Sequence, residues 1–583
     1  MIRKLARSIR QYKRDTILTP LSMTLEVIME VLLPIIMADL IDNGISAGNS
    51  AVIWRDGLLL AGVSILSLLS GLLGGVFGAR ASSGFARNLR HDMYYRLQDY
   101  SFSNIDKFST SSLITRLTTD VSNVQNAFQM LIRMAARSPL MLIFSGIMAF
   151  RVNARLALIF LCVVPFLAVG LTYVATHAHP VFRKVFKTYD SLNNVVQENV
   201  RGMRVVKSFV REDYEDKKFE DISGQVCTLF TKAERIIALN SPLMQFAMYA
   251  CTLLISWFGA KFILSSVGQP NAMTTGELNS LLTYSMQILG SLMMLSFMFV
   301  MLTISRASGE RICEVLDEQS DLHSPENART EISDGSVDFD GVSFSYAGNK
   351  KRLCLEDVNL HIHSGETIGI VGGTGSSKST LVQLIPRLYD ATEGVVKVGG
   401  HDVKEYDLEA LRNSVAMVLQ KNVLFSGTIR ENLRWGNPDA TDEDLVAACR
   451  LAQAHEFIEG FPQGYDTFIE QGGSNVSGGQ KQRLCIARAI LKKPKILILD
   501  DSTSAVDTRT DALIREGMKK IIPGTTTFII AQRISSVMEA DKIIVLDGGR
   551  VNGFGTHDEL MQINEIYREV YTSQTKGGGD YDE

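Results

Sequence analysis

A short stretch rich in glycine and serine, with a single lysine, carries the clearest chemical signal in the sequence. It follows an apolar segment, 367–371, that reads as a strand, and it precedes a helical pattern. In that context backbone N–H groups and a helix N-terminus face an anion. The stretch therefore predicts a phosphate-binding loop, made of Gly372, Gly373, Thr374, Gly375, Ser376, Ser377, Lys378, Ser379 and Thr380.

Two residues of this loop have distinct expected roles, and a third departs from the usual pattern. Lys378 reaches the terminal phosphates, and Ser379 supplies a hydroxyl ligand for Mg²⁺. The usual loop has glycine directly before the lysine, whereas this chain has Ser377. If that position requires a positive φ, a side chain there costs about 1 kcal/mol, which weakens nucleotide binding without abolishing it.

An acidic motif and a polar motif accompany the phosphate-binding loop. The apolar strand 495–499 ends in Asp500, which we expect to hold the Mg²⁺ shell. Between the loop and this strand stands the string Ser477, Gly478, Gly479 and Gln480.

These motifs belong to the second of two parts of the chain. We expect the first part to lie in the lipid bilayer and the second in water. A polar stretch containing proline, 321–333, reads as a linker, and 334–583 reads as an α/β domain with strands near 336–346 and 355–362. The first half, 1–320, concentrates the long apolar runs. A membrane domain followed by a soluble domain is the predicted organisation.

Composition excludes several classes of protein. The chain has 583 residues, 46% of them hydrophobic and 21% charged, with a net charge of −4. Its mean hydropathy of +0.10 argues against a disordered chain or a purely soluble enzyme. The charge balance gives no reason to expect a nucleic-acid partner. The seven cysteines are scattered, which excludes a disulfide framework and a zinc ribbon.

Six apolar runs are long enough to cross a bilayer as helices. The basic N-terminus and the first connection, which lacks Lys and Arg, place both termini in the cytoplasm. Residues 1–14 predict a basic amphipathic helix on the inner surface. The connections 80–130 and 177–239 predict helices that continue far into the cytoplasm. The expected spans are 16–42, 53–79, 131–151, 155–176, 243–267 and 278–303.

Some charged, amide and methionine side chains lie inside these spans. Glu26 and Glu30 share one helical face, and Arg133 and Arg137 share another. Intramembrane charges mark a substrate path or a structural pair; we favour the path for the two glutamates and pairing or snorkelling for the arginines. The last span carries Gln287, Met294 and Met298, which suit either an adaptable cavity or ordinary helix packing.

With these motifs in place, the chain resembles an ABC transporter half-unit of the exporter type over nearly its whole length. The resemblance implies a membrane α-helical domain with six transmembrane helices and long cytoplasmic extensions, followed by an α/β P-loop ATPase domain. It implies ATP and Mg²⁺ as cofactors, and Ser477–Gln480 matches the ABC signature motif.

The resemblance extends to further positions. Tyr346 resembles the aromatic residue that stacks on adenine, Gln420 the glutamine that senses Mg²⁺ and the attacking water, and Asp507 the end of the D-loop 504–507. Glu470 falls near the acidic loop before the signature. The segments 112–120 and 204–209 resemble the two coupling-helix regions.

Two departures from the family pattern bear on chemistry. The family has Glu after the aspartate that ends the strand and His near position 532; this chain has Asp501 and Gln532. A carboxylate withdrawn by roughly 1 Å can cost about 100-fold in rate, and a neutral amide cannot carry a proton. The pattern favours a degenerate ATP site on this chain. It also favours an intact signature motif that completes the ATP site of a partner.

The resemblance is close to the degenerate subunits of bacterial heterodimeric multidrug exporters. It implies export of amphipathic small molecules across the cytoplasmic (inner) membrane with a second half-transporter that bears the missing Glu and His. An ATP-gated regulator or channel with little turnover, a lipid or peptide exporter of the same architecture, and import stay open as alternatives.

Overall fold

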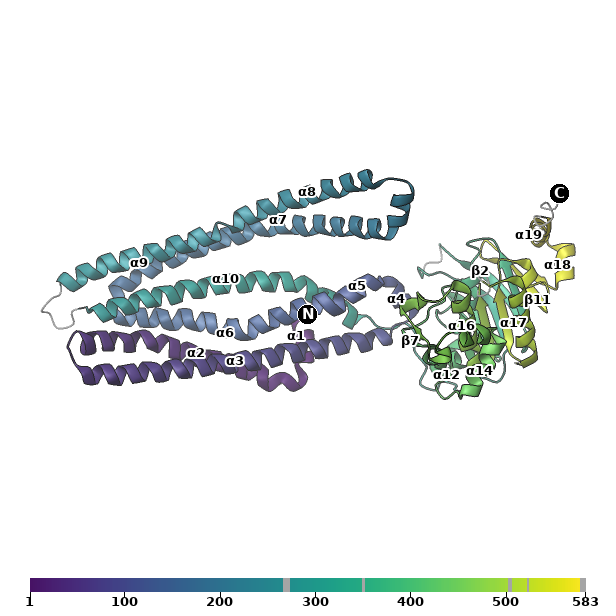
Figure 1. The fold of residues 1–583 in the computed structure, drawn as a ribbon, viewed down its shortest axis with the longest axis horizontal. Coiled ribbons are helices and arrows are strands. Elements are labelled where there is room, and N and C mark those ends of the chain that lie inside the picture. The colour runs from purple at the N-terminus through teal and green to yellow at the C-terminus, as the bar shows by residue number, and fades with distance from the viewer. Residues whose placement is uncertain (266–272, 349–351, 502–505, 522–523, 577–583) are drawn as a thin grey trace. The chain divides into compact units, whose positions relative to one another are not determined.

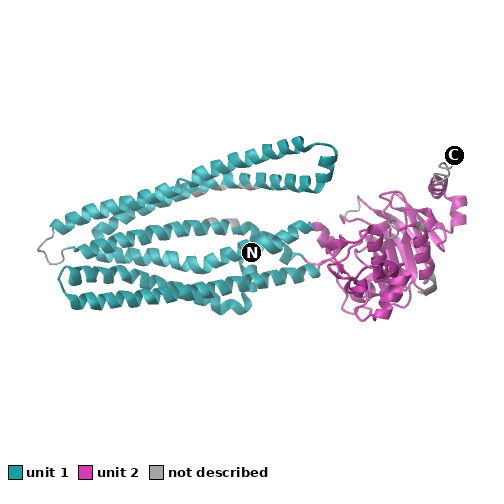
Figure 2. Ribbon diagram, viewed as in Figure 1, with its two compact units in different colours: residues 1–98, 109–318 teal, residues 99–108, 319–583 magenta. Residues whose placement is uncertain are grey.

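The computed structural model describes residues 1–265, 273–348, 352–501, 506–521 and 524–576, and they form two compact units (Figure 1). Unit 1 comprises residues 1–98 and 109–318, and unit 2 comprises residues 99–108 and 319–583 (Figure 2). Unit 2 therefore takes ten residues from between two helices of unit 1.

Unit 1 is a bundle of long helices. Six of its helical stretches are long and apolar enough to cross a membrane in the part of the chain that the structure describes, which confirms the predicted six spans. The bundle contains α1 (Ile2–Leu5), α2 (Lys13–Asp39), α3 (Ser50–Gln98), α5 (Thr110–Thr115), α6 (Val121–Val152), α7 (Ala154–Ser208), α8 (Glu212–Ile237), α9 (Asn240–Ser265) and α10 (Thr275–Asp317).

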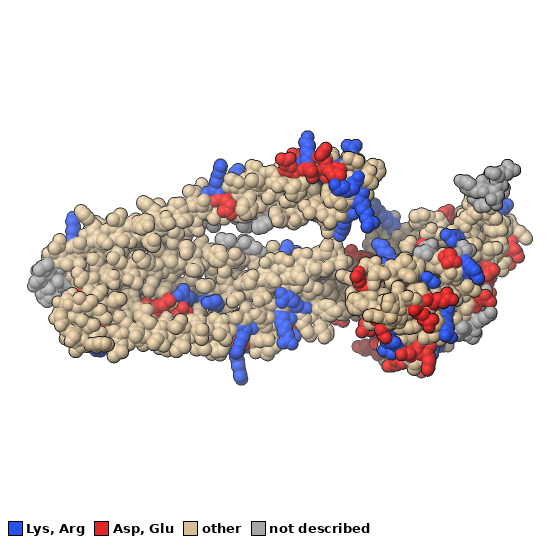
Figure 3. All heavy atoms as spheres, viewed as in Figure 1, with Lys and Arg blue, Asp and Glu red and all other residues tan. Residues whose placement is uncertain are grey.

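The spans continue well past the apolar runs. α3 and α7 are 49 and 55 residues long, and a helix crosses a bilayer core in about 20 residues. Charged side chains gather at the α7–α8 end of unit 1 on the face shown in Figure 3, whereas most of that face is uncharged. An uncharged belt with exposed leucines such as Leu68 and Leu72 is what a lipid-facing bundle requires.

The N-terminus differs from the single amphipathic helix that the sequence predicts. α1 is followed by a 3-10 segment, Ala6–Tyr12, in which Arg10 has a positive φ of 41°. The break is held in place by α3, because Ser8 Oγ and Arg10 Nη2 both donate to the carboxylate of Asp92, at 2.8 and 2.6 Å. Tertiary hydrogen bonds have overridden the helical periodicity of residues 1–14.

Unit 2 is built on a six-stranded sheet in the order β12-β11-β3-β10-β9-β6, parallel except for β12. A four-stranded antiparallel sheet, β2-β1-β4-β5, and the pair β7-β8 accompany it. The strands are β1 (Val337–Phe344), β2 (Leu355–Ile362), β3 (Thr367–Gly372), β4 (Glu393–Val398), β5 (His401–Asp402), β6 (Val415–Val418), β7 (Gly427–Thr428), β8 (Phe468–Ile469), β9 (Ile496–Asp500), β10 (Thr526–Ile530), β11 (Lys542–Asp547) and β12 (Arg550–Gly555).

Alternating residues of the central strands feed two cores. Along β9, Ile496 and Ile498 pack with the four-stranded sheet, whereas Leu497 and Leu499 pack with the helices on the other face. A parallel strand buried on both faces explains the continuous apolar run that precedes Asp500. The helices of unit 2 are α4 (Phe102–Lys107), α11 (Lys378–Gln383), α12 (Leu408–Ser414), α13 (Ile429–Arg434), α14 (Asp442–Leu451), α15 (His455–Glu459), α16 (Gly478–Leu491), α17 (Thr508–Ile521), α18 (His557–Ile563) and α19 (Glu565–Lys576).

The short helix α4 is the part of residues 99–108 that packs on the sheet domain. Tyr389 Oη donates to Asp106 Oδ2 at 2.7 Å, and the rings of Tyr389 and Phe102 are 6.0 Å apart. The segment 112–120, which resembles the first coupling-helix region, belongs to unit 1. There the fully buried Asp120 accepts from Arg311 and from Ser308 Oγ of α10, so this segment is a brace within the bundle.

Candidate nucleotide site

The predicted phosphate loop lies where β3 ends and α11 begins, at the carboxyl edge of the parallel sheet. Lys378 Nζ folds back over the loop and donates to the carbonyl oxygens of Gly372 and Gly373, at 2.9 and 2.8 Å. Burial lowers the pKa of Lys378, and the carboxylates of Asp500 and Asp501 oppose that shift. A phosphate among these amides would give the lysine the anionic partner that the carbonyls only partly replace.

Ser377 occupies the position where the family has glycine, and its backbone is left-handed, with φ 70° and ψ 27°. Ser377 caps the N-terminus of α11 without a side-chain hydrogen bond to the helix. A non-glycine residue in this region is strained by about 1–2 kcal/mol. The structure therefore meets the condition, a positive φ, under which the sequence predicts a cost.

The next pair fits a divalent cation. Ser379 Oγ donates to Asp500 Oδ1 at 3.0 Å, and Asp500 is 3% exposed. Burial raises the pKa of Asp500, while the Ser379 hydroxyl and Lys378 oppose the shift. A hydroxyl and a carboxylate converging at the loop form the oxygen donor set that Mg²⁺ prefers.

Asp501, the next residue, is surrounded by amides. Its Oδ2 accepts from Gln532 Nε2 at 2.7 Å, and its carboxylate is also hydrogen-bonded by Gln420. Its backbone carbonyl accepts from Gln482 Nε2 at 3.2 Å, and its φ is 49°. Burial raises the pKa of Asp501, and the hydrogen bonds from Gln532 and Gln420 oppose the shift. The structure thus unites Gln420, Asp501 and Gln532, residues far apart in the sequence.

Tyr346 lies beside the loop. Its hydroxyl is 3.1 Å from Thr380 Oγ1, and its ring meets Phe344 and Tyr389 edge to face at 4.9 and 5.1 Å. The residue is 49% exposed, so the ring is partly available to a planar ligand. Its position next to Thr380 suits the adenine-stacking role that the sequence suggested.

The signature residues start a helix. Ser477 caps α16, and a reciprocal pair of hydrogen bonds joins its backbone and side chain to Gln480. In the described residues, no hydrogen bond links Ser477–Gln480 to the phosphate loop.

Residues flanking the signature and the D-loop serve local structure. Asp507 Oδ1 accepts from the backbone N–H of Thr510 and so caps α17. Residues 502–505, including the first part of the suggested D-loop, lie outside the described residues. Glu470 Oε2 accepts from Ser474 Oγ at 2.6 Å, just before the signature.

Two family models match the chain: the ABC transporter transmembrane region over residues 16–292, and the ABC transporter model over residues 355–504. The chain belongs to the ABC transporter family. As one transmembrane region joined to one ATPase region, this ABC half-transporter is a multi-pass membrane protein that binds and hydrolyses ATP and works with a second half.

Relatives and a solved structure agree with that membership. The chain is 37% identical to the "Uncharacterized ABC transporter ATP-binding protein YfiB" of Bacillus subtilis over 552 residues, 95% of each chain. It is 31% identical to the "Putative multidrug export ATP-binding/permease protein YgaD" of the same species over 574 residues, 97% of this chain and 98% of the other. A bacterial Atm1-family ABC exporter with ATP bound has the same fold, with a TM-score of 0.80 at 24% identity over 97% and 98% of the two chains.

In the ABC half-transporter, three residues suggested for a substrate path, Glu26, Glu30 and Gln287, form polar contacts within the helix bundle. Arg137 Nη2 donates to Glu30 Oε1 at 2.9 Å and lies 3.6 Å from Glu26 Oε1. Gln287 accepts from Ser145 Oγ at 2.8 Å and donates to the backbone carbonyl of Glu30 at 3.2 Å. The sequence did not predict that Arg137 pairs with these glutamates, since helices α2 and α6 are far apart in the chain.

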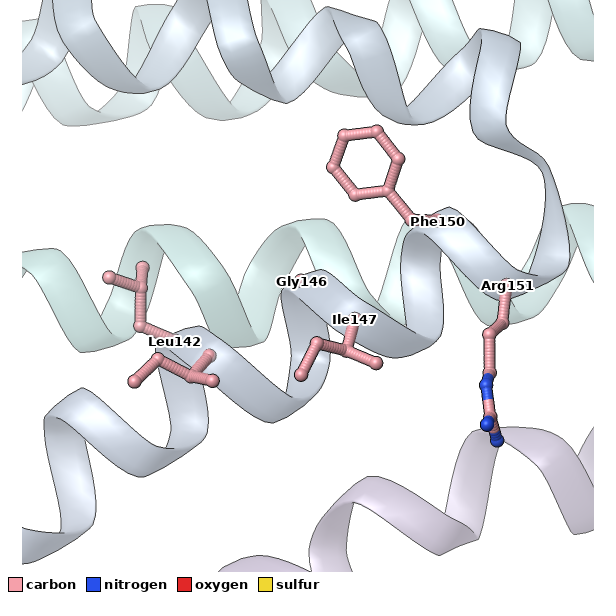
Figure 4. A pocket seen from close by; sticks show the side chains of 6 residues that line it. Leu142, Gly146, Ile147, Phe150 and Arg151 are labelled. Atoms are coloured by element: carbon pink, nitrogen blue, oxygen red, sulfur yellow. The ribbon is translucent and has the colours of Figure 1, made fainter.

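The described helices of unit 1 line more than one hollow. One, of about 560 Å³, lies along α9 and α10 and is lined by Met244, Met248, Met286 and Met293 among others. Met298 is buried and Met294 is 38% exposed, and neither lines it. Another is the exposed apolar face of α6 shown in Figure 4, where Phe150 and Arg151 stand beside Ile147.

Proposed function

We propose that this ABC half-transporter is one half of a heterodimeric exporter of amphipathic small molecules, and that its own phosphate loop holds ATP with slow turnover. The partner half would carry a glutamate and a histidine at the positions of Asp501 and Gln532. This chain's Ser477–Gln480 would complete the partner's faster site.

The observation that carries the proposal is the surrounding of Asp501. Its carboxylate accepts from Gln532 at 2.7 Å and from Gln420, so both amides compete with water for the oxygens that would activate a nucleophile. A general base must lie within hydrogen-bond reach of the water it deprotonates. The shorter Asp side chain lies further from that water than Glu would.

The nucleotide is held by residues that do not depend on Asp501. Lys378, the loop amides and Tyr346 would bind the triphosphate and the base, and Ser379 with Asp500 would hold Mg²⁺. Mg²⁺ supplies charge neutralisation between the β- and γ-phosphates when bound. Binding without rapid hydrolysis is therefore the chemistry that this set supports.

The substrate class is argued from the bundle. Four methionines line the hollow of about 560 Å³ along α9 and α10, with Asn240 and Gln245 as polar companions. Soft, flexible side chains adapt to varied apolar shapes, and a few amides suit amphipaths. The multidrug-export name of the relative YgaD agrees with this class. The proposed location is the cytoplasmic membrane with both termini in the cytoplasm.

The test is to recover the native assembly through a tag on this chain and to identify its chains by mass spectrometry. We expect one copy each of two different half-transporters, with labelled ATP remaining intact on this chain after the partner's ATP has been hydrolysed. An assembly of two identical copies with equal turnover would overturn the proposal. ATPase activity that amphipathic drugs leave unchanged would instead favour an ATP-gated regulator.

A further inference from the structure

The loop that carries Gln532 is held by a residue outside the nucleotide motifs. Gln574 lies on α19, close to the C-terminal end of the described chain. Its Nε2 donates to the backbone carbonyl of Gln532 at 2.8 Å, and its Oε1 accepts from the backbone N–H of Ile534, also at 2.8 Å. One carboxamide thus hydrogen-bonds the carbonyl of the residue before Arg533 and the N–H of the residue after it.

A second helix holds the far end of the same loop. Ser536 Oγ donates to Asp511 Oδ2 of α17 at 3.0 Å, and both residues are buried. Between these two attachments the backbone from Gln532 to Ser536 has little freedom. The side chain of Gln532 then projects onto Asp501 Oδ2 at 2.7 Å.

We propose that Gln574 is a positioning residue of the nucleotide site. It fixes the backbone of Gln532, and through it the amide that binds the carboxylate of Asp501. Through that contact the C-terminal helix α19 governs how slowly ATP is hydrolysed at this chain's loop. The inference rests on the proposed function, since it assigns a cause to slow turnover at that same site.

The physical reason is the geometry of the carboxamide. A bidentate contact restrains both the position and the rotation of a backbone segment, and two hydrogen bonds are lost when it is removed. Glutamate at 574 would keep the acceptor for the N–H of Ile534 but lose the donor to the carbonyl of Gln532. The three side chains Gln, Glu and Ala therefore form a graded series.

The experiment uses the full-length chain in its native assembly in lipid nanodiscs. One measurement follows single-turnover hydrolysis of radiolabelled 8-azido-ATP, which photo-cross-linking assigns to this chain. The other follows hydrogen exchange at the backbone N–H of Ile534. The variants are Q574A and Q574E, and the matched control is S573A, since among the described residues Ser573 Oγ donates to the Val570 carbonyl of its own helix.

We expect Q574A to hydrolyse ATP at this loop about tenfold faster, because a loosened Gln532 leaves the Asp501 oxygens open to water. Ile534 exchange should rise by at least as much, as the loss of ordinary hydrogen bonds predicts. Q574E should fall between Q574A and the wild type, and S573A should match the wild type. Hydrolysis by Q574A within about twofold of the wild type would overturn the inference, as would unchanged Ile534 exchange.

The two proposals fail differently. If the wild-type chain itself hydrolyses ATP as fast as its partner, the proposed slow site is wrong, and Q574A is then judged by Ile534 exchange. If the wild type keeps its ATP intact and Q574A keeps it intact equally long, the slow site stands and the role of Gln574 is wrong.

Discussion

At the scale of single residues, the nucleotide site departs from its family at Ser377, and at two further positions by one methylene group and one ring. Asp501 is a shorter acid than glutamate, and Gln532 is a neutral donor where the family has histidine. The structure adds that these two replacements bind each other at 2.7 Å. They form a bridge that ties the end of β9 to the loop after β10.

Restoring both family residues should restore hydrolysis at this loop. We expect the double variant D501E/Q532H to raise single-turnover ATP hydrolysis on this chain by about 10- to 100-fold, because the carboxylate moves out by roughly 1 Å toward the water. Rapid-quench assays on the assembly measure it. D501N serves as the control and should leave the assembly's ATPase rate nearly unchanged; a tenfold loss would contradict a slow site.

The left-handed backbone at Ser377 leads to a second expectation. Ser377→Gly should raise the free energy of unfolding of unit 2 by up to about 1 kcal/mol, since relief of strain exceeds the extra freedom of the unfolded chain. Thermal unfolding of the full-length protein measures it. Thr374→Gly is the matched control in the same loop, because Thr374 lacks a positive φ and should only lose stability. Equal changes in both variants would contradict the strain.

At the scale of elements, unit 1 joins α2, α6 and α10 through polar groups inside the bilayer region. Glu30 of α2 accepts from Arg137 of α6, and the Glu30 carbonyl accepts from Gln287 of α10. Buried ion pairs contribute little net stability, but the loss of one partner leaves the other charge uncompensated. The cluster therefore fixes which helices meet more than it adds to stability.

A double-mutant comparison separates these effects. Glu30→Leu alone should lower the free energy of unfolding by about 1–3 kcal/mol, because the half-buried Arg137 then loses its nearer carboxylate and keeps only Glu26, at 3.6 Å. The double variant E30L/R137L should recover most of that loss. Unfolding in detergent measures both. If the single variant is as stable as the wild type, the ion pair does not determine helix packing. If Glu30 instead lines a substrate path, the double variant should be stable but should lose transport.

The sequence predicts these elements unevenly. Apolar runs give the six spans, and the strand–loop–helix context gives the phosphate loop, because each signal is local. The break at Arg10 and the pairing of Arg137 with Glu30 depend on residues distant in the chain, so local periodicity does not contain them. Gln574 was missed for the same reason: a polar residue on a C-terminal helix carries no signal until the fold brings it to Gln532.

At the scale of the whole molecule, the division into units does not follow the order of the chain. Residues 99–108 belong to unit 2, although unit 1 precedes and follows them. Asp106 accepts from Tyr389 at 2.7 Å, and burial together with this contact raises the pKa of Tyr389. Tyr389 also packs edge to face against Tyr346, the residue expected to stack on adenine. The ring of Tyr389 therefore connects α4 to the expected adenine contact.

Removing the Tyr389 hydroxyl should loosen α4 specifically. Y389F loses a hydrogen bond to a carboxylate and should lower the unfolding free energy of unit 2 by about 1–2 kcal/mol. Hydrogen exchange of residues 102–107 should rise in the same variant. Y406F is the matched control, since it removes a buried hydroxyl bond to Val398 without touching α4. Faster exchange at α4 in both variants would contradict a specific contact.

The position of α4 also sets an order of events on the ribosome. Residues 102–107 emerge before α5 to α10 have been made, whereas Tyr389 and the strands around it emerge after them. During that interval Phe102 and Asp106 have no surface to dock on. Docking of α4 therefore waits until the segment around Tyr389 has been synthesised.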